Sequence, residues 1–165
     1  MLDLIKIKYR DDVKIFKFCE LAKILYKEFY SSLISEKETK NLIYFLQEKI
    51  IKNEIKENQY EYYLISTPSE YIGIIEAVKC NDDIINIYKI FILKQYENKK
   101  TYNELINKII IFFKKQNFKQ IKTFIPKNNI LNNIFQNNNF KHIQEAARYL
   151  GNDVYIYENI YILNI

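Results

Sequence analysis

Glu76 is the only charged residue in an apolar run that extends over residues 72–78. A carboxylate on a half-buried strand can have a raised pKa, and a raised pKa suits a group that accepts a proton during catalysis. A carboxylate on the solvent face of an alternating strand gives the same pattern. The sequence therefore marks Glu76 as a candidate base and leaves a surface position as the alternative.

A second group of candidate residues lies where a strand-like run ends and a helix-like run begins. Residues 84–93 are rich in β-branched and aromatic residues, and residues 101–116 are amphipathic with helical spacing. A helix N-terminus at this point directs free backbone N–H groups beyond the strand end, which is a suitable place for phosphate. Lys99 and Lys100 stand beside it, and an ammonium group attracts phosphate.

The cysteine and histidine content argues against a zinc site. Cys19 and Cys80 are far apart in the chain, and His142 is the only histidine. We therefore expect no metal, two buried and reduced thiols, a cytoplasmic location and a surface position for His142. No apolar stretch reaches the roughly 18 residues needed to span a membrane, so we expect no membrane partner.

The formal net charge of +5 is small and is spread along the chain. Lysines alternate with acidic residues, and the densest pairs, Lys99-Lys100 and Lys114-Lys115, are only two residues long. A nucleic-acid-binding protein usually shows a basic stripe and a docking motif. We therefore expect no nucleic-acid partner.

The 165 residues suit one domain over residues 1–165. Asp11-Asp12 predicts the cap of a first helix, in which apolar residues recur at steps of three and four. Ser35 and Glu38 have the spacing of a capping box. They predict a second helix that continues through Leu42, Phe45, Leu46 and Lys49.

Most of the remaining segments have the composition of strands. We predict strands over residues 4–9, 60–66, 71–79, 84–93 and 119–125, and two more after Phe140 that separate at residues 151–153. Short loops join the middle three, which indicates an antiparallel meander, and the helix over 101–116 then makes one parallel crossover. Pro126 is expected to open a short helix that ends near Gln136. The order predicts an α/β fold with a mixed, mainly antiparallel central sheet flanked by helices.

Several stretches taken together resemble one known superfamily. They are Tyr71-Ile72-Gly73, Tyr88–Tyr96, Asn128–Phe140 and Leu150–Tyr161. In this order they are similar to GNAT superfamily N-acetyltransferases: a fourth strand leading into the acyl-CoA loop, a later helix that commonly ends in Gly-Phe, and a final hairpin. The resemblance covers nearly all of the chain.

The acyl-CoA loop departs from the superfamily pattern of Arg/Gln-x-x-Gly-x-Gly/Ala. The chain has Glu97 at the first position, Lys100 at the first glycine and Tyr102 at the second. Side chains at the glycine positions restrict positive φ and fill space that phosphates need. Phe135 stands where the superfamily often has a tyrosine that protonates the departing thiolate, and Asn139 replaces a glycine.

The resemblance implies that acetyl-CoA is the co-substrate and that a small-molecule or peptide amine is the acceptor. Backbone N–H groups near Phe91, Ile92 and Leu93 are implied to hold the thioester oxygen. The implied contacts to the CoA phosphates come from Asn98, Lys99, Lys100, Thr101 and Tyr102. Glu76 is the implied base, and Phe29 and Tyr30 are implied to shape the acceptor site.

Two other interpretations stay open. A catalytically weak or inactive GNAT-like domain would use the same cleft to bind a ligand or partner. A structural module would form a homodimer through exposed strand edges or aromatic patches. Asp153 and Glu158, near the final hairpin, are candidates to bind a cationic acceptor and are taken first as surface residues.

Overall fold

The computed structural model describes residues 1–58, 60–151 and 153–165. In this part of the chain one seven-stranded sheet runs in the order β1-β2-β3-β4-β5-β7-β6. Among the described strands only β4 and β5 pair in parallel, and every other neighbouring pair is antiparallel. The strands are β1 Asp3–Lys6, β2 Glu61–Ser66, β3 Tyr71–Lys79, β4 Ile84–Ile92, β5 Gln120–Pro126, β6 Lys141–Gly151 and β7 Val154–Asn164. The mixed, mainly antiparallel α/β fold is confirmed.

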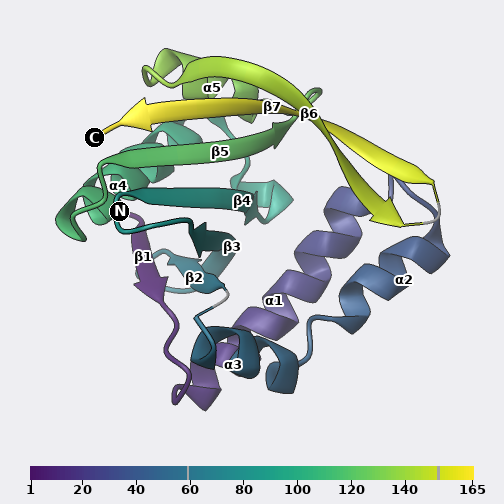
Figure 1. The fold of residues 1–165 in the computed structure, drawn as a ribbon. Coiled ribbons are helices and arrows are strands. Elements are labelled where there is room, and N and C mark those ends of the chain that lie inside the picture. Colours follow the sequence, from purple (N-terminus) through teal and green to yellow (C-terminus); the bar gives the residue numbers. More distant parts are fainter. Residues whose placement is uncertain (59, 152) are drawn as a thin grey trace.

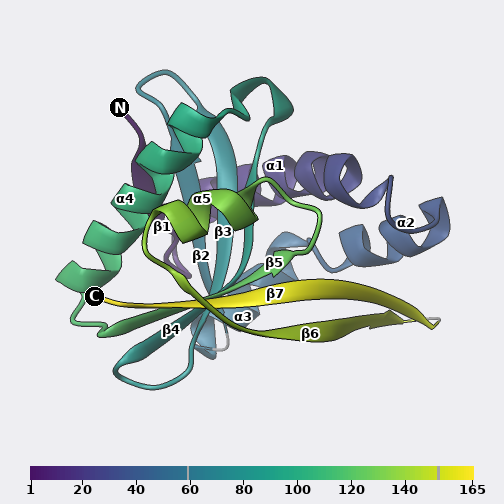
Figure 2. The same ribbon diagram turned by 90° about the horizontal axis from the view of Figure 1, so that it is seen from above.

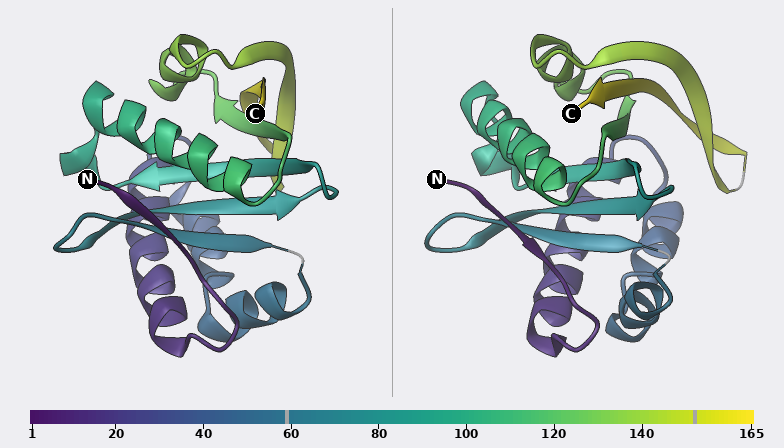
Figure 3. Two further views of the ribbon diagram at one scale, coloured as in Figure 1. Left: turned by 90° about the vertical axis from the view of Figure 1, so that its left-hand side faces the viewer. Right: turned by 60° about the vertical axis from the view of Figure 1, so that its left-hand side comes forward.

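Helices cover both faces of the sheet (Figures 1 and 3). One face carries α1 (Asp12–Tyr30), α2 (Glu36–Tyr44) and α3 (Glu48–Lys56). The other carries α4 (Lys99–Lys115) and the short α5 (Leu131–Asn137), with a single 3₁₀ turn, η1 (Lys94–Tyr96), between β4 and α4. The distal half of the β6–β7 hairpin projects from the body of the sheet (Figure 2).

Each helical layer builds its own hydrophobic core against the sheet. Between α4, α5 and the sheet lie residues such as Leu105, Ile109, Ile121 and Phe135. Between α1 and the sheet lie Phe18, Leu25, Leu64 and Ile74. Because β2 and β3 are covered on both faces, their apolar runs are nearly continuous. The predicted cap of α1 is confirmed, since the Asp11 side chain accepts a hydrogen bond from the N–H of Lys14.

The second predicted helix is in fact two helices. The capping box of Ser35 and Glu38 is present, but α2 ends at Tyr44 and α3 begins at Glu48. Gln47 adopts an extended conformation between them. The break turns Leu46 into the core, where it is 4% exposed, and leaves Phe45 60% exposed. Helical spacing alone could not show that the two apolar neighbours point apart.

The short helix after β5 begins later than expected. Pro126 does not open it, because Pro126 still pairs with Glu158 of β7 as the last residue of β5. A turn follows, and the Asn129 side chain accepts a hydrogen bond from the N–H of Leu131, the first residue of α5. The first strand is also shorter than predicted, since β1 ends at Lys6.

β4 and β5 separate toward their C-terminal ends (Figure 1). Their ladder pairs only Ile84–Ile87 with Gln120–Thr123, although β4 continues to Ile92 and β5 to Pro126. On its other side β4 stays close to β3. A Cβ on Gly73 would lie 2.4 Å from the carbonyl oxygen of Phe91, so only glycine fits there. The sheet is therefore tight between β3 and β4 and open between β4 and β5.

Candidate functional site

A cavity of about 440 Å³ lies where β4 and β5 separate. Its walls come from the C-terminal turns of α1, the end of β4, the start of α4 and the turn between β5 and α5. The charged residues in its lining are Glu28, Lys94 and Glu97. A narrow extension of about 10 Å³ shares Phe29, Ile90, Phe91, Pro126 and Asn129 with it and continues past Tyr88, Lys89, Phe124 and Arg148. We call these spaces the cleft and the passage.

The end of β4 turns one backbone N–H toward the cleft. Leu93 donates its N–H to the carbonyl oxygen of Ile72 at 2.8 Å, on the β3 side. Donors alternate in direction along an antiparallel ladder, so Phe91 also faces β3 while Ile92 faces β5. The β4–β5 ladder has ended by this point. Of the three N–H groups that the resemblance implied, the geometry favours that of Ile92.

The start of α4 is capped by its own chain. The Asn98 side chain accepts a hydrogen bond from the N–H of Thr101 at 2.9 Å, and the Asn98 carbonyl accepts from the N–H of Tyr102 at 3.1 Å. Lys99 and Lys100 are the first two helical residues and their side chains are exposed. Their two N–H groups are thus left for an anion, with two ammonium groups beside them.

Glu97 and Tyr102 both line the cleft, and the Tyr102 hydroxyl donates to Oε1 of Glu97 at 2.9 Å. The Tyr102 ring is 2% exposed and packs into the core under α4. Burial and the Glu97 carboxylate raise the pKa of Tyr102. The two side chains that replace the superfamily's usual residues therefore hold each other at the rim of the cleft.

Phe29 and Tyr30 have different positions. Phe29 lines both the cleft and the passage, and its ring centroid lies 4.6 Å from that of Phe91. Tyr30 is 1% exposed and packs behind Phe29, with ring centroids 4.9 Å apart. Direct contact with a ligand is thus open to Phe29, whereas Tyr30 supports it from behind.

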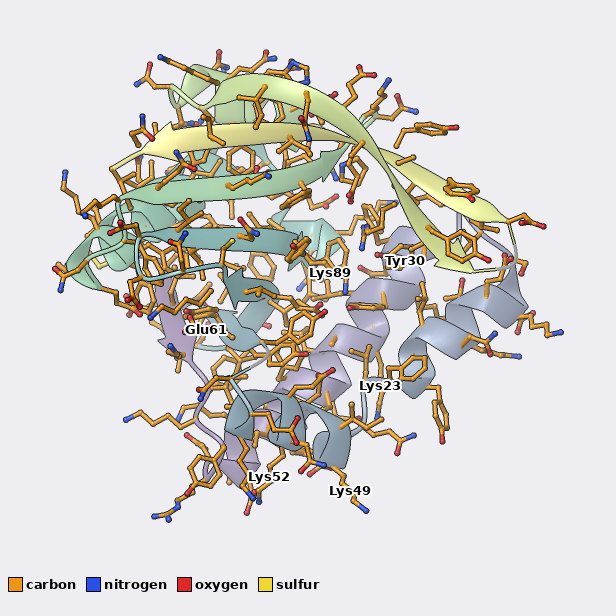
Figure 4. The ribbon with its side chains drawn as sticks, viewed as in Figure 1. Lys23, Tyr30, Lys49, Lys52, Glu61 and Lys89 are labelled. Carbon is orange, nitrogen blue, oxygen red and sulfur yellow. The ribbon has the colours of Figure 1, made fainter. Side chains whose placement is uncertain are left out.

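Glu76 is buried beneath α1 and is 4% exposed, so the surface alternative for this residue is wrong. Its Oε1 accepts a hydrogen bond from the Tyr26 hydroxyl at 2.6 Å, and its Oε2 lies 2.5 Å from Nζ of Lys89. Burial, with Glu76 as the next cause, raises the pKa of Tyr26 far above its ordinary value. Figure 4 shows Lys89 between the sheet and α1, the helix that carries Tyr26. Glu76 itself is not in the lining of the cleft or the passage.

A second buried ion pair joins the two strands of the final hairpin. Glu158 is 2% exposed, so its expected surface position is wrong. Nη2 of Arg148 donates to its Oε1 at 2.7 Å. Burial raises the pKa of Glu158, and Arg148 opposes that shift. Sequence reasoning missed this pair because an alternating strand on a projecting hairpin gives no sign of what packs against it. Its one signal was that Arg148 is one of only two arginines.

Phe135 is fully buried and packs edge-on against Phe140, as expected of a core aromatic residue. Asn139 has a φ of 65°, which asparagine tolerates better than most residues, so its exchange for glycine is mild. Tyr88 and Tyr102 reach the passage and the cleft, whereas Tyr149 is 57% exposed on the hairpin. Tyr88 and Tyr102 therefore lie in the walls of these spaces, and Tyr149 does not.

No group of three or more potential metal ligands occurs among the described residues. No helix in the described ranges is long and apolar enough to cross a membrane. His142 is exposed, as expected.

No protein-family model and no curated protein matches the chain. Solved structures do match over its full length. PaiA N-acetyltransferase from Thermoplasma acidophilum, in complex with coenzyme A, is 18% identical with a TM-score of 0.71, covering 100% of this chain and 99% of that one. A GNAT-family acetyltransferase from Streptococcus pneumoniae is 13% identical with a TM-score of 0.69, covering 100% of both chains.

Spermidine N-acetyltransferase from Vibrio cholerae, in complex with CoA and spermine, is 16% identical with a TM-score of 0.68, covering 99% of this chain and 95% of that one. At these identities the likeness shows the fold. The fold of the chain is that of the GNAT superfamily N-acetyltransferases.

Proposed function

We propose that the chain is an N-acetyltransferase that takes acetyl-CoA in the cleft and transfers the acetyl group to a small-molecule or peptide amine. The observation that carries the proposal is the separation of β4 and β5 with the Ile92 N–H facing the opening. Neighbours with this fold include a complex with CoA and enzymes whose names specify spermidine. The two free cysteines support a reducing, cytoplasmic setting.

The residues present fit acetyl-CoA, the acetyl donor, in the following way. The pantetheine arm would run between the diverging ends of β4 and β5, where the lining includes Ile90, Phe91, Ile92 and Pro126. The CoA phosphates would lie at the start of α4, against the N–H groups and ammonium groups of Lys99 and Lys100. The hydrogen bond to Tyr102 offsets part of the negative charge that Glu97 brings to this point.

The reaction requires little of the protein beyond positioning and proton transfer. The neutral amine attacks the thioester carbon, the C–N bond forms and the C–S bond breaks, releasing the CoA thiolate. The Ile92 N–H would stabilise the oxygen that becomes negative in between, as an oxyanion hole does. Glu76 remains a prediction as the base, and a proton would reach it only through Nζ of Lys89 or the hydroxyl of Tyr26.

A second candidate function is a GNAT-like domain that binds a ligand or partner with weak or no catalysis. The observation that favours it is the start of α4, where Asn98 already occupies the Thr101 N–H and Glu97 adds a carboxylate. A pyrophosphate would then meet two free N–H groups instead of a full cradle.

One experiment separates the two functions. Calorimetry with acetyl-CoA and with CoA measures binding, and thiol release in the presence of a panel of primary amines measures turnover. The acetyltransferase requires both saturable binding and turnover. Saturable binding without turnover on any amine supports the second function, and no heat with either nucleotide rejects the acetyl-CoA proposal.

A further inference from the structure

The guanidinium of Arg148 has one buried donor without an acceptor. Its Nε is buried and makes no hydrogen bond among the described residues, although the side chain lines the passage between β4 and β5. Leaving a buried donor unpaired is costly, so native proteins usually satisfy such groups with an acceptor from the protein or from water.

The geometry of arginine places that donor beside Glu158. In a guanidinium, Nε–H and one N–H of Nη2 point the same way and form the fork that carboxylates bind. Oε1 of Glu158 occupies the Nη2 half of this fork at 2.7 Å. Whatever binds the Nε–H half therefore lies next to the Glu158 carboxylate.

The passage has room for one water molecule. Its volume of about 10 Å³ is close to the minimum that holds a single water. Polar groups in its lining include Asn129, Lys89 and Arg148, so it can supply the two to four hydrogen bonds that a buried water needs. The passage shares Phe29 and Phe91 with the cleft, and so connects the water position with the place where an amine would react.

We infer that Arg148 Nε–H and Glu158 hold a water molecule that takes the proton from the acceptor amine and passes it to the Glu158 carboxylate. This inference rests on the proposed acetyltransferase function. The bound ammonium loses one proton through the water, Glu158 becomes a neutral acid, and the free amine attacks the thioester. A second proton leaves the nitrogen as the C–N bond forms and the C–S bond breaks, and it goes to the departing CoA thiolate. Glu158 later returns its own proton to solvent, so both protons are accounted for over one turnover.

Neither Glu76 nor Glu158 is in the lining of the cleft or the passage, and each bonds to a residue of the passage lining, Lys89 or Arg148. Glu158 suits the proposed role better for two reasons. Both oxygens of Glu76 are engaged, one by Tyr26 and the other by Lys89. The charged and titratable groups around Glu158 are Arg148 from β6, Lys89 from β4 and, beside Arg148, the hydroxyl of Tyr30 from α1. Burial raises the pKa of Glu158, so this carboxylate accepts a proton more readily than an ordinary glutamate does.

The water site can be tested without turnover. Arg10 and Arg148 are the only arginines, so ¹⁵N-arginine labelling gives two Nε–H signals, which Arg10→Lys assigns. We expect the Arg148 signal to titrate with Glu158 and to stay constant over the same pH range in Glu158→Gln. A crystal structure should show solvent on Nε. An Nε–H bonded to a side chain, with no solvent there, overturns the inference.

The proton route is tested by the pH dependence of kcat with acetyl-CoA and the amine panel. Glu158→Gln keeps an acceptor for Arg148, and we expect it to lower kcat about a hundredfold and to remove the acidic limb. Glu76→Gln should retain that limb, as should the matched hairpin control Glu145→Gln, whose exposed carboxylate pairs with Lys127. The proton route is overturned if the acidic limb of the kcat profile is unchanged in Glu158→Gln. It is also overturned if that limb disappears only in Glu76→Gln. A wild-type protein with no turnover rejects the proposed function, and the arginine signals then still decide the water site.

Discussion

The Tyr102 hydroxyl donates a hydrogen bond to Oε1 of Glu97 at 2.9 Å, which links the last residue before the Asn98 cap to the fourth residue of α4. Both side chains line the cleft. The superfamily pattern has Arg or Gln at the first of these positions and Gly or Ala at the second. In this chain the two positions carry a hydrogen-bonded side-chain pair at the rim of the cleft.

Glu97→Gln should strengthen CoA binding. The substitution removes a negative charge near the proposed phosphate position, and the amide oxygen can still accept the Tyr102 hydrogen bond. Near a protein surface one such charge contributes on the order of 1 kcal/mol, so we expect a threefold to tenfold lower Kd by calorimetry. The control is Asp82→Asn, which changes an exposed carboxylate in the β3–β4 turn. Weaker binding of CoA to Glu97→Gln would mean that Glu97 contacts the nucleotide favourably.

Asn98→Ala should lower the stability of α4 and at the same time strengthen the binding of CoA. Losing the cap bond to Thr101 costs about 1 kcal/mol of unfolding free energy. The same change frees the Thr101 N–H for a phosphate oxygen, so the stabilisation by CoA should increase. Ser35→Ala is the matched control, because Ser35 caps α2 in the same way but lies outside the cleft lining.

Thermal unfolding with and without CoA measures both effects. Without CoA, we expect Asn98→Ala and Ser35→Ala to lose similar amounts of thermal stability. With CoA, we expect a larger rise in unfolding temperature only for Asn98→Ala. An equal shift in both variants would show that the Thr101 N–H does not meet the phosphates.

Local signals in the sequence were sufficient for much of the fold. Asp11 and Ser35 have side chains that cap a helix directly, and the period-two and period-four patterns depend only on neighbouring residues. The parallel crossover between β4 and β5 followed from the order of the elements. Pro126 was misread because its pairing with Glu158 depends on a strand more than 30 residues further along the chain.

The candidate site was less predictable, because its key contacts join distant segments. Glu76 was correctly singled out as unusual, but its partners Tyr26 and Lys89 come from a helix and a neighbouring strand. The resemblance indicated residues 97–102, yet only the structure shows that Tyr102 reaches back to Glu97. A sequence pattern reports the face on which a residue lies, and it does not report what covers that face.

Cys19 and Cys80 should differ sharply in reactivity. Burial raises the pKa of Cys19 to about 11, whereas Cys80 is exposed, so the expected burial is confirmed for Cys19 and wrong for Cys80. At pH 8 about one Cys19 in a thousand is a thiolate, which is the reactive form. A thiol reagent should therefore modify one cysteine in the native protein and two in denaturant, and Cys80→Ser should leave none in the native protein.

The same shift has a consequence for stability. The pKa of Cys19 is higher in the folded state than its ordinary value of 9.0. The contribution of the Cys19 thiol to the free energy of unfolding is therefore complete below pH 9.0 and is lost as the pH rises through about 11. Cys19→Ala should not show this part of the fall in unfolding free energy at alkaline pH. Rapid native modification of Cys19 at pH 8 would contradict its burial.

The Glu76–Lys89 pair should show the energetics of a buried ion pair. Glu76→Leu leaves the Lys89 ammonium, which is 16% exposed, without its carboxylate, and we expect a loss of about 3 kcal/mol in the free energy of unfolding. Glu76→Leu with Lys89→Met removes both charges and should recover most of that loss. A remainder of about 1 kcal/mol is expected because the Tyr26 hydroxyl then has no acceptor.

Adding Tyr26→Phe to the double variant removes that hydroxyl as well and should bring stability close to that of the wild type. Urea denaturation of the four proteins measures the series, with equal m-values showing that the denatured states are comparable. A single variant that loses less than about 0.5 kcal/mol would mean that Lys89 escapes to water when Glu76 is removed. Lys89 Nζ also contacts the hydroxyl of Tyr26 in α1. An ammonium that moves into water loses this contact, so the Glu76–Lys89 pair would then not hold α1 to the sheet.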